Sequence, residues 1–216
     1  MRITKAAKQE MLAILEEWYR GMETALHYTT PFELLVAVIL SAQCTDERVN
    51  IITARLFAQY NSPDKILELG QAGLEEQIRD CGLFRGKARN IIATCDILCR
   101  KYGGEVPADF EALTELPGVG RKTANVVLSQ LFHVPAIAVD THVFRVANRL
   151  GLAKGETPLA VEQGLMKAIP REQWSAAHHW LIWHGRKVCK ARKPECDNCR
   201  LTALCLAFNT NKKTAP

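Results

Sequence analysis

The chain has 216 residues, which is enough to bury a hydrophobic core without help from disulfides or a metal. Its composition, with 48% hydrophobic and 24% charged residues, excludes a disordered chain, a collagen-like repeat and a coiled coil. The net charge of +5 is unevenly spread, because eight lysines and arginines and only two acidic residues lie between Gly185 and Pro216. Such a basic end fits a polyanionic partner and, equally, a solvated tail.

The residues predict an all-α fold, because Ala, Leu, Glu, Lys and Arg dominate and strand-like alternation is rare. We predict helices over residues 4–20, 32–44, 47–60, 71–81, 85–102, 109–116, 121–132, 140–150, 158–169 and 172–184. A further short helix begins at residue 62, and the end of the chain is rich in loops. Pro31 suits a first helical turn, and Asp46 suits an N-cap. Val134-Pro135 interrupts the helices and predicts a break between two lobes.

No segment predicts a membrane span or a secretion signal. The longest apolar stretch, around Leu34–Leu40, is too short to cross a bilayer. The N-terminus has early charges but no apolar signal region. We therefore expect a cytoplasmic, monomeric protein with no membrane partner.

The eight cysteines fall into two groups. Cys44, Cys81, Cys95 and Cys99 are scattered in apolar helical surroundings, where buried, reduced thiols are the expectation. The other group follows the pattern C-x6-C-x2-C-x5-C and consists of Cys189, Cys196, Cys199 and Cys205. Four thiolates on a short loop can converge on a metal. The spacing disfavours two disulfides and leaves both zinc and an iron–sulfur cluster open, with a slight preference for the cluster.

The stretch LPGVGRKTA at Leu116–Ala124 predicts a hairpin between two helices. Gly118 and Gly120 can take left-handed backbone angles and expose N–H groups, so this turn and the helix after it could hold a DNA phosphate. Arg121 and Lys122 at the helix start oppose the helix macrodipole, which favours a function over a plain helix cap. A Walker A loop is excluded, because a helix precedes the turn and Arg121 follows Gly120.

Two residues of this region can carry chemistry. A lysine at a positive helix end and beside Arg121 is expected to have a lowered pKa, and partial burial would lower it further. Lys122 could then supply a neutral amine as a nucleophile. Asp140 is expected to cap the helix that follows it, which would also hold its carboxylate ionised and fixed in direction.

Four motifs in order, LLVAVILSAQCTD, LPGVGRKTA, VDTHVFRV and the terminal cysteine pattern, closely resemble the endonuclease III family over nearly the whole chain. This family comprises bacterial DNA glycosylases and AP lyases of the helix-hairpin-helix superfamily. The resemblance implies a helical-barrel lobe over 23–134 that contains the hairpin at 116–124. It implies a second lobe, over 1–22 and 135–216, that carries a 4Fe-4S cluster with its loop at 189–205. DNA would bind in the groove between the lobes.

The resemblance also implies roles for single residues. Lys122 is the implied nucleophile and Asp140 the implied essential carboxylate. The implied cluster ligands are Cys189, Cys196, Cys199 and Cys205. Gln43 and Leu83 match positions that enter the base stack, and His142 lies beside the implied pocket. The implied phosphate contacts are Gly118, Gly120 and Arg121 in the hairpin, with Lys190, Arg192 and Lys193 in the cluster loop.

The implied activity is the removal of oxidised pyrimidines from duplex DNA, with cleavage 3′ to the abasic site by β-elimination through a lysine Schiff base. Such an enzyme would work on the nucleoid. One alternative is a non-catalytic DNA-binding iron–sulfur protein. Another is an adenine DNA glycosylase, which is disfavoured because Lys122 is present and Ala37 stands near the position of that group's catalytic glutamate. The eleven residues after Cys205 are also too few for its extra domain.

Overall fold

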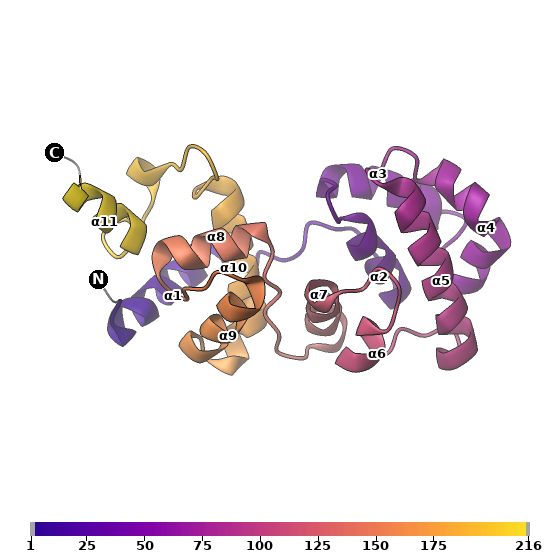
Figure 1. Cartoon of the computed structure of the whole chain (residues 1–216), viewed down its shortest axis with the longest axis horizontal. Coiled ribbons are helices and arrows are strands. Elements are labelled where there is room, and N and C mark those ends of the chain that lie inside the picture. Colours follow the sequence, from indigo (N-terminus) through magenta and orange to yellow (C-terminus); the bar gives the residue numbers. More distant parts are fainter. Residues whose placement is uncertain (1–2, 215–216) are drawn as a thin grey trace. The chain divides into compact units, whose positions relative to one another are not determined.

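The computed structural model describes residues 3–214, and every regular element in this range is a helix, which confirms the all-α prediction. The chain divides into two compact units (Figure 1). Ala25–Val134 forms one unit, called here the middle unit. The segments up to Thr24 and from Pro135 onward form the other, the terminal unit. None of the described helices is long and apolar enough to cross a bilayer.

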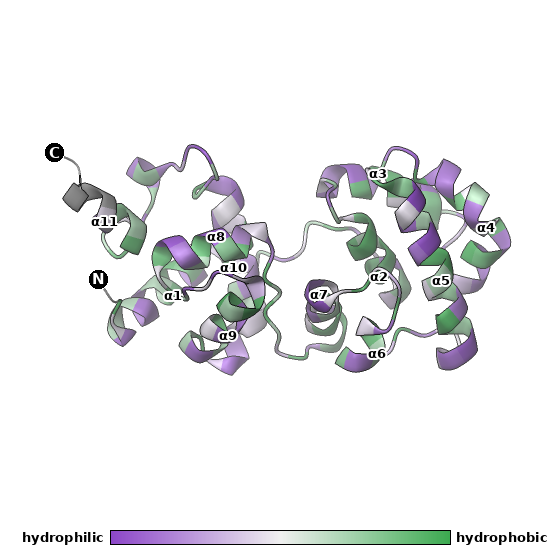
Figure 2. Cartoon of the chain, in the orientation of Figure 1, coloured by the Kyte–Doolittle hydropathy of each residue, from purple (hydrophilic) through white to green (hydrophobic). Residues whose placement is uncertain are grey.

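The middle unit is built around one buried helix. Its elements are α2 (Pro31–Leu40), α3 (Asp46–Phe57), α4 (Pro63–Gln77), α5 (Phe84–Tyr102), α6 (Phe110–Thr114) and α7 (Arg121–Phe132). Residues 32–40 of α2 are all buried, and Figure 2 shows this helix almost uniformly hydrophobic. Helices α3, α5 and α7 pack against it. A helix that is apolar on all sides belongs inside a fold, and this one forms the centre of the unit's core.

The buried Glu33 in α2 is explained by the start of the helix. Its carboxylate accepts hydrogen bonds from the backbone N–H and the hydroxyl of Thr29, at 2.6 and 2.7 Å. The Thr30 hydroxyl in turn accepts from the Glu33 amide at 3.2 Å, and Pro31 occupies the first turn. These bonds satisfy the carboxylate and the helix N-terminus together, so the charge can lie at the edge of an apolar core.

The terminal unit joins the two ends of the chain. Its elements are α1 (Lys5–Tyr19), α8 (Thr141–Leu150), α9 (Pro158–Ala168), the 3-10 helix η1 (Arg171–Gln173), α10 (Trp174–Lys187), η2 (Cys196–Asn198) and α11 (Leu206–Thr214). Helix α10 packs against both α1 and α8. Met11, Leu15, Val143, Val146 and Leu181 are fully buried in the core that these helices share.

Several helix boundaries differ from the prediction. Helix α2 ends at Leu40 rather than Cys44, because a turn begins at Ser41. Thr45, not Asp46, caps α3, with its hydroxyl accepting from the Arg48 amide at 3.3 Å. Helix α10 runs past His184 to Lys187. Helix α11 was not predicted, because most of its residues are polar and they show only a weak pattern of apolar positions. Gly70, at φ +71°, interrupts α4 between the two helices predicted there.

Candidate functional site

The hairpin before α7 is a rigid turn that requires glycine at one position. Gly118 has φ +83°, and a Cβ there would lie 3.0 Å from Asn90 Nδ2. The Thr94 hydroxyl donates to the Pro117 carbonyl at 2.9 Å and ties the turn to α5. Gly120 is the N-cap of α7 and has φ −91°, so the left-handed angle that a glycine allows is used at Gly118 and not at Gly120. Extended backbone at Gly120 follows because the turn is already closed at Gly118.

Arg121 and Lys122 occupy the first turn of α7 and are exposed. The guanidinium of Arg121 lies 5.0 Å from the ring centroid of Phe110, which directs this cation along α6. Lys122 lacks the partial burial that would favour its neutral form, because the start of α7 is at the surface while the core begins at Ala124. Removal of the Lys122 side chain from water therefore does not explain any reactivity of this residue as a nucleophile.

Asp140 is the N-cap of α8, as predicted. Its Oδ1 accepts from the Val143 amide at 2.7 Å. The side chain is half-buried, so one carboxylate oxygen is fixed by the helix. Lys122 belongs to the middle unit and Asp140 to the terminal unit, so the two predicted catalytic residues are supported by separate cores.

His142 is oriented by an arginine one turn further along α8. Arg145 Nη2 lies 3.2 Å from His142 Nδ1 and 2.9 Å from the Gly185 carbonyl. Because a guanidinium can only donate, Nδ1 is the acceptor, and a neutral ring carries its proton on Nε2. A Cβ at Gly185 would lie 3.0 Å from His142 Cβ, so α10 packs closely against this side chain. The ring is thus held with a defined tautomer.

Gln43 and Leu83 share an unusual backbone conformation. Both are non-glycine residues with positive φ, +53° and +59°, and both are exposed, Leu83 to 66%. Their turns adjoin, since a Cβ at Gly82 would lie 3.4 Å from the Gln43 carbonyl oxygen. Left-handed angles cost energy for such residues and occur preferentially at functional sites. The structure therefore brings together two residues that are far apart in the sequence.

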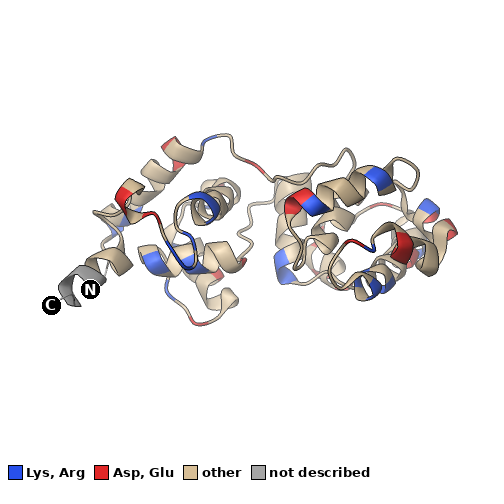
Figure 3. Cartoon of the chain, turned by 90° about the horizontal axis from the view of Figure 1, so that it is seen from above, with Lys and Arg blue, Asp and Glu red and all other residues tan. Residues whose placement is uncertain are grey.

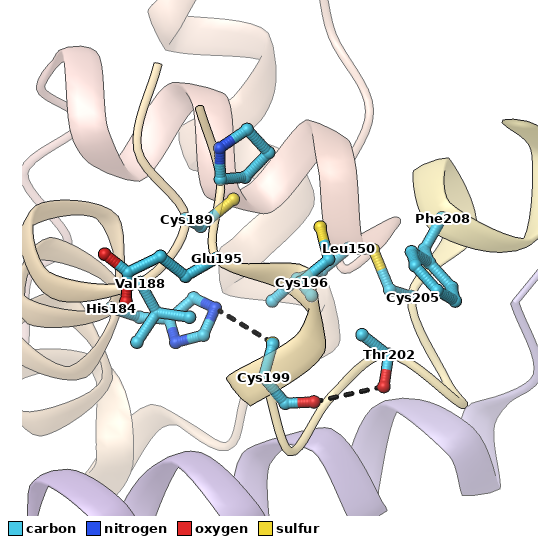
Figure 4. A pocket seen from close by; sticks show the side chains of 11 residues that line it. Leu150, His184, Val188, Cys189, Glu195, Cys196, Cys199, Thr202, Cys205 and Phe208 are labelled. Carbon is cyan, nitrogen blue, oxygen red and sulfur yellow. Dashed lines mark hydrogen bonds between the residues drawn. The ribbon is translucent and has the colours of Figure 1, made fainter. Parts of the chain in front are cut away.

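The four C-terminal cysteines line one cavity that is partly open to solvent (Figure 4). Apolar side chains of Leu150, Val188 and Phe208 complete the lining. All eight cysteines, which lie within the described range, are free. Within residues 3–214, no three His, Cys, Asp or Glu side chains are drawn together around a single-ion position.

A buried hydrogen-bond chain approaches this cavity from α1. The Tyr19 hydroxyl lies 3.1 Å from His184 Nδ1, and His184 Nε2 lies 3.8 Å from Cys199 Sγ (Figure 4). Burial lowers the pKa of His184 to about 4, so the ring is neutral at pH 7. Burial, and then the nearby Cys199 and Cys189, raise the pKa of Tyr19 above its usual range. A neutral ring can accept from Tyr19 and donate to the sulfur.

The thiols of the cavity influence one another. The pKa of Cys199 is raised, first by burial and then by the charges of the other three cysteines, and the pKa of Cys205 is raised mainly by burial. Four thiolates crowded in this way repel one another. A cationic metal group would remove that repulsion by binding the thiolates.

Two arginines of α8 hold the cysteine loop, and sequence reasoning missed both. Arg149 donates to the carbonyls of Lys190 and Ala191 at 2.7 and 2.8 Å, and approaches Cys189 Sγ at 3.5 Å. Arg145 Nε donates to the Cys189 carbonyl at 3.1 Å. A spacing of four residues puts both on one face of α8. That spacing was the available signal, but their partners lie about forty residues away.

The basic residues of the cysteine loop are exposed, but they are not equivalent. The Lys190 ammonium forms an ion pair with Glu195, so a phosphate would have to compete with that carboxylate. Arg192 and Lys193 are exposed, and the backbone of their loop is held by Arg149. Lysines and arginines also lie on the middle unit (Figure 3), so positive charge is not confined to the C-terminal end.

Comparison with known proteins places the chain in a family. The model of the HhH-GPD superfamily of base excision DNA repair proteins matches residues 36–171. Endonuclease III of Rickettsia conorii is 60% identical over 183 residues, which cover 85% of this chain and 87% of that protein. Endonuclease III of Escherichia coli is 51% identical over 203 residues and covers 94% and 96%.

A solved structure is similar over almost the whole chain. It is described as a trapped endonuclease III–DNA covalent intermediate, an estranged-adenine complex, and has a TM-score of 0.93 at 48% identity. The match covers 97% of this chain and 99% of that one. Together with the hairpin, the capped Asp140 and the cysteine cavity, these similarities show that the chain belongs to the endonuclease III family within the HhH-GPD superfamily of base excision DNA repair proteins.

Proposed function

We propose that this chain removes oxidised pyrimidines from duplex DNA and then cuts the strand 3′ to the abasic site. The observation that carries the proposal is an exposed lysine, Lys122, at the start of a helix behind a glycine hairpin, as is expected for a nucleophile that must reach DNA. A covalent protein–DNA intermediate has been trapped in a structurally similar endonuclease III. Such an intermediate requires a nucleophilic side chain, and Lys122 is the candidate here.

The target base must leave the helical stack before the reaction, because its sugar carbon C1′ is out of reach inside a duplex. Gln43 and Leu83 are suited to fill the space left behind. Their turns adjoin and their backbones are held in the left-handed region, which directs both side chains away from the core. Leu83 is the apolar wedge of the pair.

The reaction then uses Lys122 and Asp140. The Lys122 amine attacks C1′ as the base leaves with the electrons of the glycosidic bond. The Asp140 carboxylate, fixed in direction by the Val143 amide, stabilises positive charge on the sugar. The C1′–O4′ bond of the sugar then breaks, with O4′ taking up a proton and the amine losing one, which gives a Schiff base on Lys122. Removal of a C2′ proton then expels the 3′ phosphate. Hydrolysis of the imine returns the free amine.

The cysteine cavity fits a 4Fe-4S cluster held by Cys189, Cys196, Cys199 and Cys205. A single zinc ion would draw all four sulfurs to about 2.3 Å from one centre. Four thiols that line one cavity among apolar side chains suit a larger group held by four thiolates. When bound, the group would cross-link the loop and serve as a structural rather than a reacting part. Four irons per chain and a visible absorbance are expected, and stoichiometric zinc would contradict the assignment.

Arg149 and Arg145 hold the loop that carries Arg192 and Lys193, so we propose that this loop contacts DNA phosphates without reading bases. The substitution Arg192→Ala is expected to weaken binding to all sequences and to reduce the slope of log affinity against log salt by about 0.9. Lys190→Ala is expected to have a smaller effect, because Lys190 is already paired with Glu195.

The measurement is DNA binding over a series of salt concentrations, with Lys167→Ala as the control. Lys167 is an exposed lysine of α9 in the same unit. If the Arg192→Ala protein showed the same slope of log affinity against log salt as the wild-type protein, the cysteine loop would not be part of the DNA interface.

The proposed substrate is tested by borohydride trapping on two duplexes. We expect a covalent adduct on a duplex with one thymine glycol and none on a duplex with adenine opposite 8-oxoguanine. The reverse result would identify an adenine glycosylase, and tight binding with no adduct on either duplex or on abasic DNA would identify a non-catalytic DNA-binding protein.

A further inference from the structure

Two cysteines that the sequence suggested to be separate core thiols lie in the adjoining turns that carry Gln43 and Leu83. Cys44 directly follows Gln43, and Cys81 lies two residues before Leu83. The two segments adjoin at these residues, because a Cβ at Gly82, next to Cys81, would lie 3.4 Å from the carbonyl oxygen of Gln43, next to Cys44. Burial and, to a smaller extent, Cys44 raise the pKa of Cys81. Cys81 Sγ also donates to the Leu40 carbonyl at 3.4 Å. The two thiols are therefore neighbours although they belong to distant segments of the chain.

A buried lysine completes this cluster. Lys87 is 6% exposed, and its ammonium donates to the Leu40 carbonyl at 2.8 Å and to Cys81 Sγ at 3.0 Å. Leu40 is the last residue of α2, so the charge also lies at the negative end of that helix. Burial raises the pKa of Cys81, while Lys87 acts in the opposite direction. Lys87 is positioned to stabilise a thiolate at Cys81 whenever one forms.

The two thiols differ in access. Cys44 is half-buried, whereas Cys81 is 2% exposed. An oxidant from solvent would reach Cys44 first, and Cys81 would be the second thiol. A partly accessible thiol beside a shielded one is the arrangement of a peroxidatic and a resolving cysteine.

We propose that Cys44 and Cys81 form a reversible oxidation site, and that its oxidation affects the two turns that carry Gln43 and Leu83. A peroxide oxidises the Cys44 thiol to a sulfenic acid and is itself reduced to water. The Cys81 thiolate, paired with the Lys87 ammonium, then attacks the Cys44 sulfur and displaces hydroxide, which takes up the proton from Cys81 to leave as water. In total the two thiols lose two protons and two electrons, the peroxide becomes two molecules of water, and one disulfide forms.

The disulfide would change the geometry of the turns. A disulfide holds its two Cα atoms about 4.4–6.8 Å apart and its Cβ atoms about 3.5–4.5 Å apart. It would therefore tie the residue after Gln43 to the turn that ends at Leu83. This consequence rests on the proposed function, since it assumes that both residues enter the base stack. The oxidation step itself does not depend on that function.

The first experiment treats the intact protein with a few equivalents of hydrogen peroxide and maps its peptides without reduction. We expect a Cys44–Cys81 linked pair that dithiothreitol reverses and that Lys87→Met forms more slowly. Cys95 and Cys99 are the internal control, because residues four apart on α5 hold their Cβ atoms about 5–6 Å apart, too far for a disulfide. Failure to find the linked pair, or linkage of Cys95 to Cys99 at an equal rate, would overturn the proposal.

The second experiment measures binding of the reduced and oxidised protein to abasic duplex DNA. Oxidation is expected to weaken binding of the wild-type protein by about tenfold or more, and reduction is expected to restore it. Cys44→Ala should bind as the reduced wild type does and should not respond to peroxide. If the disulfide-linked protein bound abasic DNA as tightly as the reduced protein, the proposed effect of the disulfide on the two turns would be wrong. A reduced protein that does not bind at all would count against the proposed function, while the peptide map would still decide the oxidation site.

Discussion

Lys122→Gln is expected to abolish covalent trapping on abasic DNA and to lower strand cleavage by roughly four orders of magnitude or more. Glutamine keeps a polar side chain of similar length at the start of α7 but cannot form an imine. The side chain is exposed, so the substitution should leave the fold and its thermal stability almost unchanged. The measurement is borohydride trapping and single-turnover cleavage, with affinity for the same DNA measured in parallel.

Lys65→Gln is the matched control for this result. Lys65 is an exposed lysine of α4 in the same unit, and its ammonium donates to Asn61 Oδ1 at 3.1 Å. We expect this variant to trap and cleave as the wild-type protein does. If Lys122→Gln still formed the adduct, another amine would be the nucleophile and the role given to the hairpin lysine would be wrong.

Asp140→Asn should lower the single-turnover rate by about 10²- to 10⁴-fold while leaving affinity for abasic DNA within a small factor. Asparagine caps helices about as well as aspartate, so the bond from the Val143 amide to the side-chain oxygen can persist. Only the negative charge is lost. The substitution therefore separates the capping role of this residue from its electrostatic role.

The chain offers a matched control in a second capping aspartate. Asp109 caps α6, and its Oδ1 accepts from the Ala112 amide at 2.8 Å. Asp109→Asn should change neither rate nor stability appreciably. Equal rates for Asp140→Asn and the wild-type protein would show that the residue is a helix cap and nothing more.

The sequence alone was sufficient for the helical class and for most helix positions, and it supplied the candidate chemical groups. Local signals explain this success. Pro31 and Pro63 lie in first turns, and Gly103 ends α5 at φ +60°. The four spaced cysteines and the LPGVGRKTA hairpin are short motifs whose chemistry depends on residues close together in the chain. Such features are encoded by neighbours, so a linear pattern contains them.

Other features depended on contacts that no local pattern describes. The bond between Tyr19 and His184 joins residues 165 positions apart. Lys87, Cys81 and the end of α2 meet because α5 packs against α2, and Arg149 reaches the cysteine loop because α8 packs beside α10. The positive φ angles of Gln43 and Leu83 follow from the way their turns join buried helices. Propensity and motif spacing determined the helices and the candidate reactive groups. Tertiary packing decided which of those groups are buried, paired or exposed, because burial and long-range pairing are properties of the assembled core.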